Sequence, residues 1–199
     1  MRIASALLDD ADHQVRSAAR LVGGALARAG RPEHPAEADM IDAALVARYR
    51  GADQVPELCD LMAALGNSTG PAVLPVIEQA LADPGGPLRA AAARALRLYP
   101  GPDVDGLLSK AMTSDPDPSV RTNAIVAAHF RHPLSRPLAE SLVRVARTDS
   151  VDSIRSRAIA LLRQNPKASP RTAEALAWIA DNDGNPGIRR LAREALTPP

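Results

Sequence analysis

The sequence has very few aromatic residues and only one cysteine. Aromatic residues make up 2% of the 199 positions, whereas apolar residues as a whole make up 46%. A core that is filled by Ala, Leu, Val and Ile suits closely packed helices better than a β-sandwich, whose strands draw on aromatic and β-branched residues. A single cysteine excludes an internal disulfide framework.

The sequence also lacks an excess of charge and long apolar runs. Lys and Arg number 24 against 23 Asp and Glu, so the net charge is +1 and gives no argument for a nucleic-acid or membrane partner. Acidic residues interrupt the N-terminal stretch MRIASALLDDADHQ before a signal-peptide core can form, and no apolar run approaches transmembrane length. We therefore expect a soluble, cytoplasmic protein without a membrane partner.

Proline and glycine divide the chain into helix-length segments. Apolar residues recur within them at helical spacing, as at Ile154, Ala158, Leu161 and Leu162, and no segment shows the period of two that is typical of a half-buried strand. The pattern predicts an all-α fold of helix pairs. The first helices of the pairs are expected near 1–9, 37–50, 71–82, 102–113, 135–147 and 170–180. The second helices are expected near 14–29, 55–66, 87–98, 118–131, 152–163 and 186–196.

An internal repeat runs through these pairs. An aspartate precedes an arginine by six residues in five places, and an apolar residue stands directly before each arginine. The five pairs, which we call the arginine ladder, are Asp10 and Arg16, Asp83 and Arg89, Asp115 and Arg121, Asp149 and Arg155, and Asp183 and Arg189. In a sixth, degenerate copy Cys59 takes the place of the arginine. Neighbouring copies are mostly 30 to 34 residues apart, which is the length of a helix–turn–helix unit.

The stretch DPDPSVRTNA and its counterparts resemble the HEAT repeat, particularly its short bacterial form, over essentially the whole chain. The resemblance implies an α-α superhelix of about six helix pairs, the first incomplete, in one array over 1–199. Its units are expected near 1–30, 37–66, 71–98, 102–131, 135–163 and 170–196. The last helix keeps an apolar stripe, whereas terminal repeats normally carry a polar outer face, so we expect a fragment of a longer array or of a larger protein. Edge-to-edge self-association through exposed terminal helices is the alternative.

The ladder arginines lie in the first turn of each second helix, where a cation opposes the helix dipole at a cost of about 0.3–1 kcal/mol. A charge-assisted hydrogen bond to a partly buried carboxylate contributes about 1.5–3 kcal/mol, so pairing outweighs that cost. We therefore expect each ladder arginine to bind the inter-helix aspartate of its own or the adjoining unit, in a structural role.

In HEAT-like arrays the second helices line the concave face, so partner-binding side chains are expected there. The candidates are Arg94, Arg97, Thr122, Asn123, His129, Arg157, Arg163 and Arg190, with Arg20 and Arg193 at the edge. This basic and polar strip fits an acidic or extended protein or peptide segment, and an ordinary solvated face is the other interpretation. Nucleic acid fits less well, because single-strand binders use stacking aromatic residues that this chain lacks.

The sequence contains no motif for catalysis, a metal or a cofactor. HEAT-type hydroxylases hold iron with repeated His-Glu pairs, but here Glu33–His34 is a single pair in the reverse order. HEAT-like DNA glycosylases use tryptophans on the second helices, whereas Trp178 belongs to a first helix. We expect a non-catalytic interaction scaffold, and a bilin-lyase-like enzyme, a lipid-carrier-like protein or a weak nucleic-acid binder are the alternatives. Cys59 is expected at a buried, unreactive seam, and Trp178 in the core or at a seam.

Overall fold

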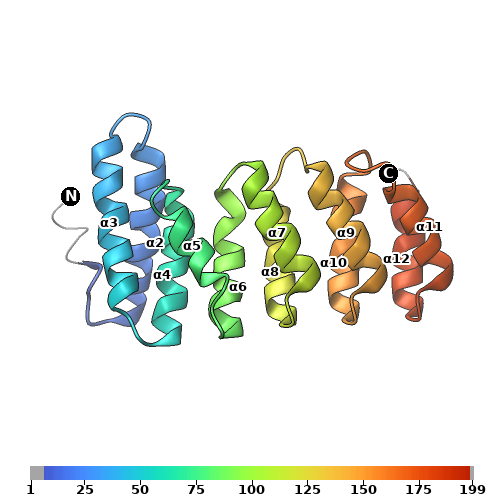
Figure 1. Ribbon diagram of the computed structural model, residues 1–199, viewed down its shortest axis with the longest axis horizontal. Helices are drawn as coiled ribbons and strands as arrows, with labels where there is room; N and C mark the ends of the chain where they lie inside the picture. Colours follow the sequence, from blue (N-terminus) through green and yellow to red (C-terminus); the bar gives the residue numbers. More distant parts are fainter. Residues whose placement is uncertain (1–6, 198–199) are drawn as a thin grey trace. The chain divides into compact units, whose positions relative to one another are not determined.

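The computed structural model describes residues 7–197, and all of the regular structure in that range is helical (Figure 1). The predicted all-α fold of helix pairs is therefore confirmed. The chain divides into two compact units, residues 1–99 and residues 100–199. Each is described by itself below as unit 1 and unit 2.

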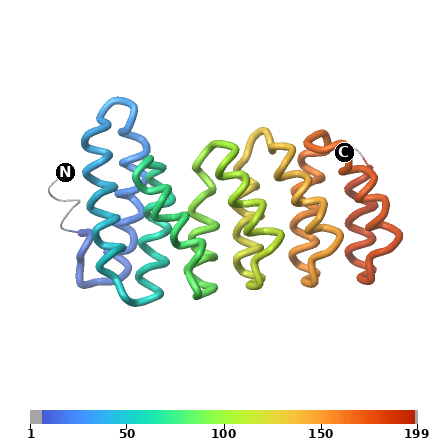
Figure 2. The backbone as a smooth tube through the Cα atoms, in the orientation of Figure 1, coloured from blue at the N-terminus to red at the C-terminus, as the bar shows by residue number. Residues whose placement is uncertain are grey.

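First and second helices of the repeats alternate along the chain, and we call them A helices and B helices. In unit 1 the B helices are α2 (His13–Gly30), α4 (Val55–Ser68) and α6 (Gly86–Ala95), which continues as the 3-10 helix η1 (Leu96–Leu98). The A helices of unit 1 are α3 (Pro35–Gly51) and α5 (Leu74–Ala80). Within unit 1, α2 packs against α4 and α4 against α6, as the run of the chain in Figure 2 shows.

Unit 2 contains three complete helix pairs. Its A helices are α7 (Pro102–Ser114), α9 (Arg136–Thr148) and α11 (Thr172–Asn182). Its B helices are α8 (Pro118–Ala128), α10 (Asp152–Gln164) and α12 (Pro186–Leu196). Neighbouring A helices pack against each other, and so do neighbouring B helices.

The inter-helix aspartates explain where the B helices begin. In each ladder pair the aspartate Oδ1 accepts a hydrogen bond from the backbone N–H two residues further on, at 2.7–2.9 Å. Such a turn lets a short side chain replace a backbone acceptor. In unit 2, Pro118 and Pro186 stand in the first turn of their helices, where a missing N–H costs nothing.

Two helices are shorter than expected. α5 covers Leu74–Ala80 instead of 71–82, because residues 71–73 form a turn ahead of it. α8 ends at Ala128 instead of 131, because the backbone N–H groups of Phe130 and Arg131 bond three residues back, to Ala127 and Ala128, in a tighter turn. The expected helix near 1–9 falls mostly outside the described residues.

Small residues let the B helices of unit 1 approach closely. A Cβ atom on Gly24 would lie 2.1 Å from the carbonyl oxygen of Ala64, and one on Gly66 would lie 2.6 Å from Cα of Ala95. Leu61 and Leu65 of α4 are fully buried beside these contacts. The core is thus built of aliphatic residues at short interhelical distance. In the part of the chain from 7 to 197, every helix is too short or too polar to cross a membrane.

Candidate functional site

The ladder arginines of unit 2 tie consecutive repeats together. Arg121 donates from Nε to Oδ2 of Asp149 at 2.7 Å and from Nη2 to Oδ1 at 3.0 Å. Arg155 makes the same pair of bonds to Asp183, at 2.8 and 3.0 Å. The hydrogen bond with Asp149 raises the pKa of Arg121 more than burial lowers it.

Each ladder arginine also bonds to its own turn, but through the backbone and not through the carboxylate. Nη1 of Arg121 donates to the backbone carbonyl of Asp115 at 3.0 Å, and Nη1 of Arg89 donates to that of Asp83 at 2.9 Å. The backbone carbonyl of Asp183 accepts likewise from Arg189 at 2.6 Å, and Arg16 bonds to the carbonyl of Asp10. The carboxylate of the same aspartate is left for its own N–H turn and, at Asp149 and Asp183, for the arginine of the preceding repeat.

On the B helices of unit 1, two arginines bond to one asparagine, and a third arginine lies close to one of them. Nε of Arg28 donates to the backbone carbonyl of Asn67 at 3.2 Å, while Arg97 bonds to the side-chain oxygen of Asn67. Nη1 of Arg97 also donates to the backbone carbonyl of Arg94 at 3.4 Å. Arg28 and Arg94 are exposed, and Arg97 is half-buried. Of the expected site residues, Arg94 and Arg97 are thus brought together, and we call Arg28, Arg94 and Arg97 the unit 1 arginine cluster.

The electrostatics of this cluster are unfavourable. Burial, and then the charges of Arg94 and Arg28, lower the pKa of Arg97. Neither Arg28 nor Arg94 forms an ion pair with any residue in the range 7–197. Sequence spacing missed Arg28, because only the packing of α2 on α4 brings it to Asn67. The side-chain amide of Asn67, which donates to the backbone carbonyl of Leu21 at 3.2 Å, fixes that contact.

On the B helices of unit 2 the expected site residues form a polar surface but are not brought together at one place. Thr122 and Asn123 line a shallow groove of about 240 Å³ between α8 and α10, but the Asn123 amide donates to the backbone carbonyl of Ser119 on its own helix. His129 lies past the end of α8, where its ring makes an edge contact with Phe130.

The expected arginines of α10 and α12 differ in their pairing. Arg157 and Arg163 are exposed and form no ion pair within the described range. Arg190 lies 3.6 Å from Glu194 of its own helix. Two of the three guanidinium groups therefore have no acidic partner among residues 7–197.

Two arginines that the sequence placed at the edge of this face behave differently. Arg20 is 4% exposed, donates to the backbone carbonyl of Leu8 at 3.0 Å and pairs with Glu57 at 2.9 Å. Arg20, which was expected at the edge of the concave face, is instead buried, because the turn before α2 and the neighbouring α4 enclose it. Arg193 donates to the backbone carbonyl of Ala180 at 2.7 Å and remains exposed.

Cys59 and Trp178 both lie where neighbouring repeats meet. Sγ of Cys59 is 3.7 Å from the backbone carbonyl of Pro87 at the start of the next B helix. Cys59 is half-buried, and burial, followed by the charges of Asp60 and Asp83, raises the pKa of its thiol. Trp178 is 42% exposed, and the guanidinium carbon of Arg147 lies 4.5 Å from the centre of its ring. Between residues 7 and 197 no group of three or more His, Cys, Asp or Glu is arranged to hold a metal ion.

The solved structures that resemble this chain are helical repeat proteins. The chain is similar to CpcE and CpcF of phycocyanin lyase from Nostoc sp. PCC7120, with 21% identity and a TM-score of 0.60 over 78% of this chain and 98% of that one. It is also similar to an engineered protein, with 19% identity and a TM-score of 0.54 over 98% and 94% of the two chains. A third likeness is to computationally designed armadillo repeat proteins for modular peptide recognition, with 15% identity and a TM-score of 0.51 over 98% and 97%. At these identities the likeness concerns the fold alone.

Among curated proteins the search finds no match. The family model of HEAT repeats matches residues 45–128 and 73–163, which together span more than half of the chain. The matched residues contain three of the ladder pairs, Asp83 and Arg89, Asp115 and Arg121, and Asp149 and Arg155. This protein belongs to the HEAT-repeat family.

Proposed function

We propose that this HEAT-repeat protein is a non-catalytic interaction scaffold whose B helices bind an acidic, extended segment of a partner protein. The observation that carries the proposal is the proximity of Arg28, Arg94 and Arg97, two of which, Arg28 and Arg97, bond to Asn67. The three guanidinium groups are close together and repel one another, and a bound carboxylate would relieve that repulsion. Bidentate carboxylate binding is the contact for which the arginine fork is best suited.

The division of the arginines into two classes supports this proposal. The ladder residues Arg121 and Arg155 are largely buried and occupied by carboxylates of their own chain. Arg94, Arg157 and Arg163 are exposed and have no such partner within residues 7–197. These arginines lie on B helices of both units, Arg94 on α6 and Arg157 and Arg163 on α10. Designed armadillo repeat proteins for modular peptide recognition share the fold.

The test uses a fluorescein-labelled peptide of ten glutamates and measures its fluorescence anisotropy as the protein is added. We expect saturable binding that weakens as salt is raised, because exposed ion pairs are screened. Arg94→Glu together with Arg97→Glu should abolish binding, and Arg157→Glu with Arg163→Glu should weaken it.

Arg50→Glu is the matched control, because Arg50 is exposed on the A helix α3. This variant should bind the peptide as the unaltered protein does, and circular dichroism should show that all variants remain folded. Equal binding by the Arg94→Glu, Arg97→Glu protein would contradict the proposal. Stronger binding to an oligonucleotide of equal charge would favour nucleic acid instead.

A bilin-lyase-like activity is the alternative function, and the likeness to CpcE and CpcF supports it only through the fold. Mixing the protein with a linear tetrapyrrole and recording the visible absorption spectrum separates the two functions. An unchanged spectrum is expected for a scaffold.

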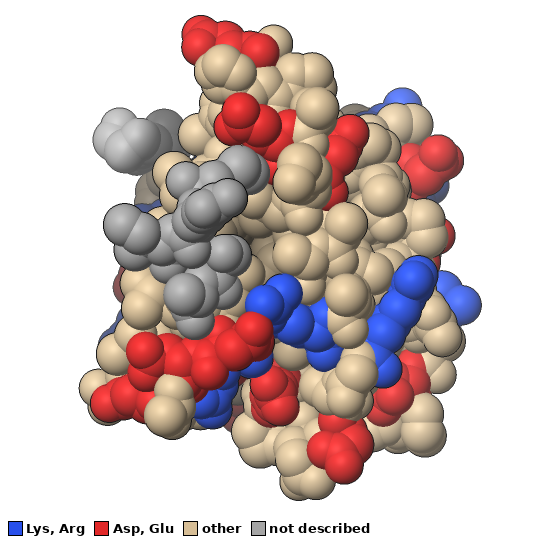
Figure 3. All heavy atoms as spheres, turned by 90° about the vertical axis from the view of Figure 1, so that its left-hand side faces the viewer, with Lys and Arg blue, Asp and Glu red and all other residues tan. Residues whose placement is uncertain are grey.

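We also propose self-association through α2. Val15, Val22 and Leu26 are 40%, 56% and 53% exposed on this helix, whereas Leu65, which holds the place of Val22 in the next repeat, is fully buried. Figure 3 shows uncharged surface between acidic and basic groups on the side of unit 1 that faces the viewer. Sedimentation velocity should detect a dimer that Val22→Asp with Leu26→Asp disrupts, and a monomer at all concentrations would contradict this proposal.

A further inference from the structure

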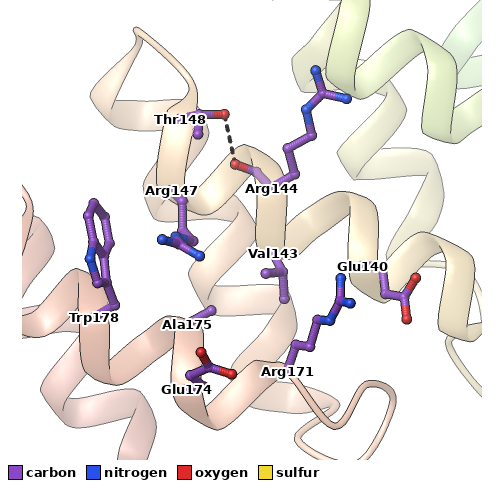
Figure 4. Close-up of a pocket in the computed structure, with 9 residues that line it drawn as sticks. All are labelled: Glu140, Val143, Arg144, Arg147, Thr148, Arg171, Glu174, Ala175 and Trp178. Atoms are coloured by element: carbon purple, nitrogen blue, oxygen red, sulfur yellow. Dashed lines mark hydrogen bonds between the residues drawn. The ribbon is translucent and has the colours of Figure 1, made fainter.

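A second binding groove lies between two A helices of unit 2, apart from the B-helix surface discussed above. It has a volume of about 620 Å³ and runs between α9 and α11 (Figure 4). Val143 and Ala175 are buried and form an apolar floor. Polar and charged side chains of both helices stand around that floor.

At one end of the groove a guanidinium lies over the face of an indole. Arg147 of α9 faces the ring of Trp178 of α11, with 4.5 Å between its guanidinium carbon and the ring centre. The attraction between a cation and the face of an aromatic ring restricts where the arginine side chain lies. Arg147 is exposed and donates no hydrogen bond to any residue between 7 and 197. The groove therefore holds an oriented cation whose donors are free for a ligand.

The other charges of the groove limit what that ligand can be. Glu140 is paired with Arg136 at 2.8 Å, and Figure 4 shows the side chains of Glu140 and Arg171 at the end of the groove away from Trp178. Glu174 also lines the groove and has no cation partner among the described residues. Arg144 and Arg171 line the groove as well. The two carboxylates that stand among these arginines disfavour a polyanion such as a nucleic acid, while one carboxylate on Arg147 is accommodated.

From this geometry we propose that the groove between α9 and α11 binds a peptide segment in which a single acidic residue stands next to an apolar one. The carboxylate pairs with the in-plane N–H groups of Arg147. The apolar side chain lies on Val143 and Ala175 against the exposed face of Trp178. The combination of one oriented cation with an adjacent apolar floor distinguishes this ligand from the highly acidic segment proposed for the B helices.

Trp178 is the only tryptophan of the chain, so its fluorescence reports on this groove alone. The probe is an acetylated and amidated peptide with one glutamate between two leucines, and the matched control peptide carries glutamine instead. Titration with the glutamate peptide should quench or shift the Trp178 emission. We expect Arg147→Gln to weaken that binding about tenfold or more, the loss typical of a removed charge-assisted hydrogen bond.

Three results of the peptide titrations would overturn the inference. These are an emission that does not respond to the glutamate peptide, an equal response to the glutamine peptide, and unchanged affinity of the Arg147→Gln protein. An equal response to sodium acetate would also overturn it, because a free anion would then suffice without the apolar neighbour. Lys110→Gln, on the exposed surface of α7, is the control variant and should bind as the unaltered protein does.

The B-helix site and the groove between α9 and α11 can be tested separately. Arg94→Glu with Arg97→Glu should leave the response of Trp178 to the glutamate peptide unchanged. Arg147→Gln should in turn leave anisotropy binding of the ten-glutamate peptide unchanged. Loss of both signals in either variant would contradict the existence of two separate sites.

Discussion

Arg121 and Asp149 form a two-point ion pair across the seam between two consecutive repeats of unit 2. The distances are 2.7 Å for Nε to Oδ2 and 3.0 Å for Nη2 to Oδ1, and the two side chains are 12% and 4% exposed. The third guanidinium nitrogen, Nη1, bonds to the backbone carbonyl of Asp115 in the turn before its own helix. One side chain therefore holds two inter-helix turns together.

Removal of this arginine should destabilise the protein without affecting partner binding. Arg121→Ala leaves the buried carboxylate of Asp149 without its counter-charge, and we expect the free energy of unfolding to fall by about 3 kcal/mol. Urea denaturation measures that change. Arg157→Ala, which removes an exposed and unpaired arginine, should change stability by less than about 0.5 kcal/mol. An unaltered melting temperature of the Arg121→Ala protein would rule out the structural role.

The stability of unit 2 should depend on pH through Asp183. Burial raises the pKa of this carboxyl, but the hydrogen bonds from Arg155 and from the backbone N–H of Asn185, with the charges of Arg155 and Arg189, outweigh burial and lower it. Because its pKa is lower in the folded state, this carboxyl stabilises the protein at pH values above its unfolded pKa of about 3.9. That stabilisation is lost as the pH falls through the pKa of the folded state.

The measurement compares unfolding free energies of the unaltered protein and Asp183→Asn from neutral pH down to strongly acidic pH. The two proteins should differ most near neutral pH, and the difference should shrink as pH falls below about 4. Asp181→Asn, at an exposed and unpaired position on α11, is the control and should follow the unaltered protein. A difference that is independent of pH would contradict the assignment to Asp183.

The close approach of α4 and α6 should make Gly66 intolerant of a side chain. A Cβ atom there would lie 2.6 Å from Cα and 2.7 Å from Cβ of Ala95, so the helices must separate. We expect Gly66→Ala to cost about 1–3 kcal/mol, as overpacking of a core does. Gly51→Ala meets no atom within 4 Å and should be neutral or slightly stabilising. Thermal unfolding of both variants tests this, and equal melting temperatures would argue against the close contact.

Cys59 should react slowly while the protein is folded. The raised pKa of its thiol keeps the thiolate scarce at neutral pH, and the thiolate is the nucleophile. Alkylation by iodoacetamide at pH 7.5 (about one unit below the free thiol pKa) should be slower than that of free cysteine. In urea the rate should rise to that of free cysteine. Equal rates in both conditions would show an unshifted thiol.

The repeat was predictable because it shows as a regular spacing of residues that are close in the sequence. The Asp-to-Arg separation of six residues and the apolar periodicity depend only on helix geometry, and they locate α7, α9 and α10 to within one residue of their observed ends. α5 was less predictable, because a turn takes the place of its expected first residues.

The contacts between helices were only partly predictable. Spacing indicates that Arg121 meets an aspartate, but it does not distinguish the backbone carbonyl of Asp115 from the carboxylate of Asp149. The spacing placed Arg20 at the edge of the concave face, whereas the packing of α2 on α4 buries this side chain against Glu57. The unit 1 arginine cluster and the stacking of Arg147 on Trp178 join residues of different helices and leave no signal in spacing.

The sequence by itself determined the all-α class, the helix pairs and the membership of Asp115 and Arg121 in a repeated turn, because these follow from interactions within about one helical turn. Only the tertiary structure decided which cations are neutralised and which are left free. That depends on the direction of long side chains relative to neighbouring helices, which is set by interhelical distance and packing. Arg121 is therefore held by Asp149, whereas Arg94 and Arg147 keep free charge at the surface.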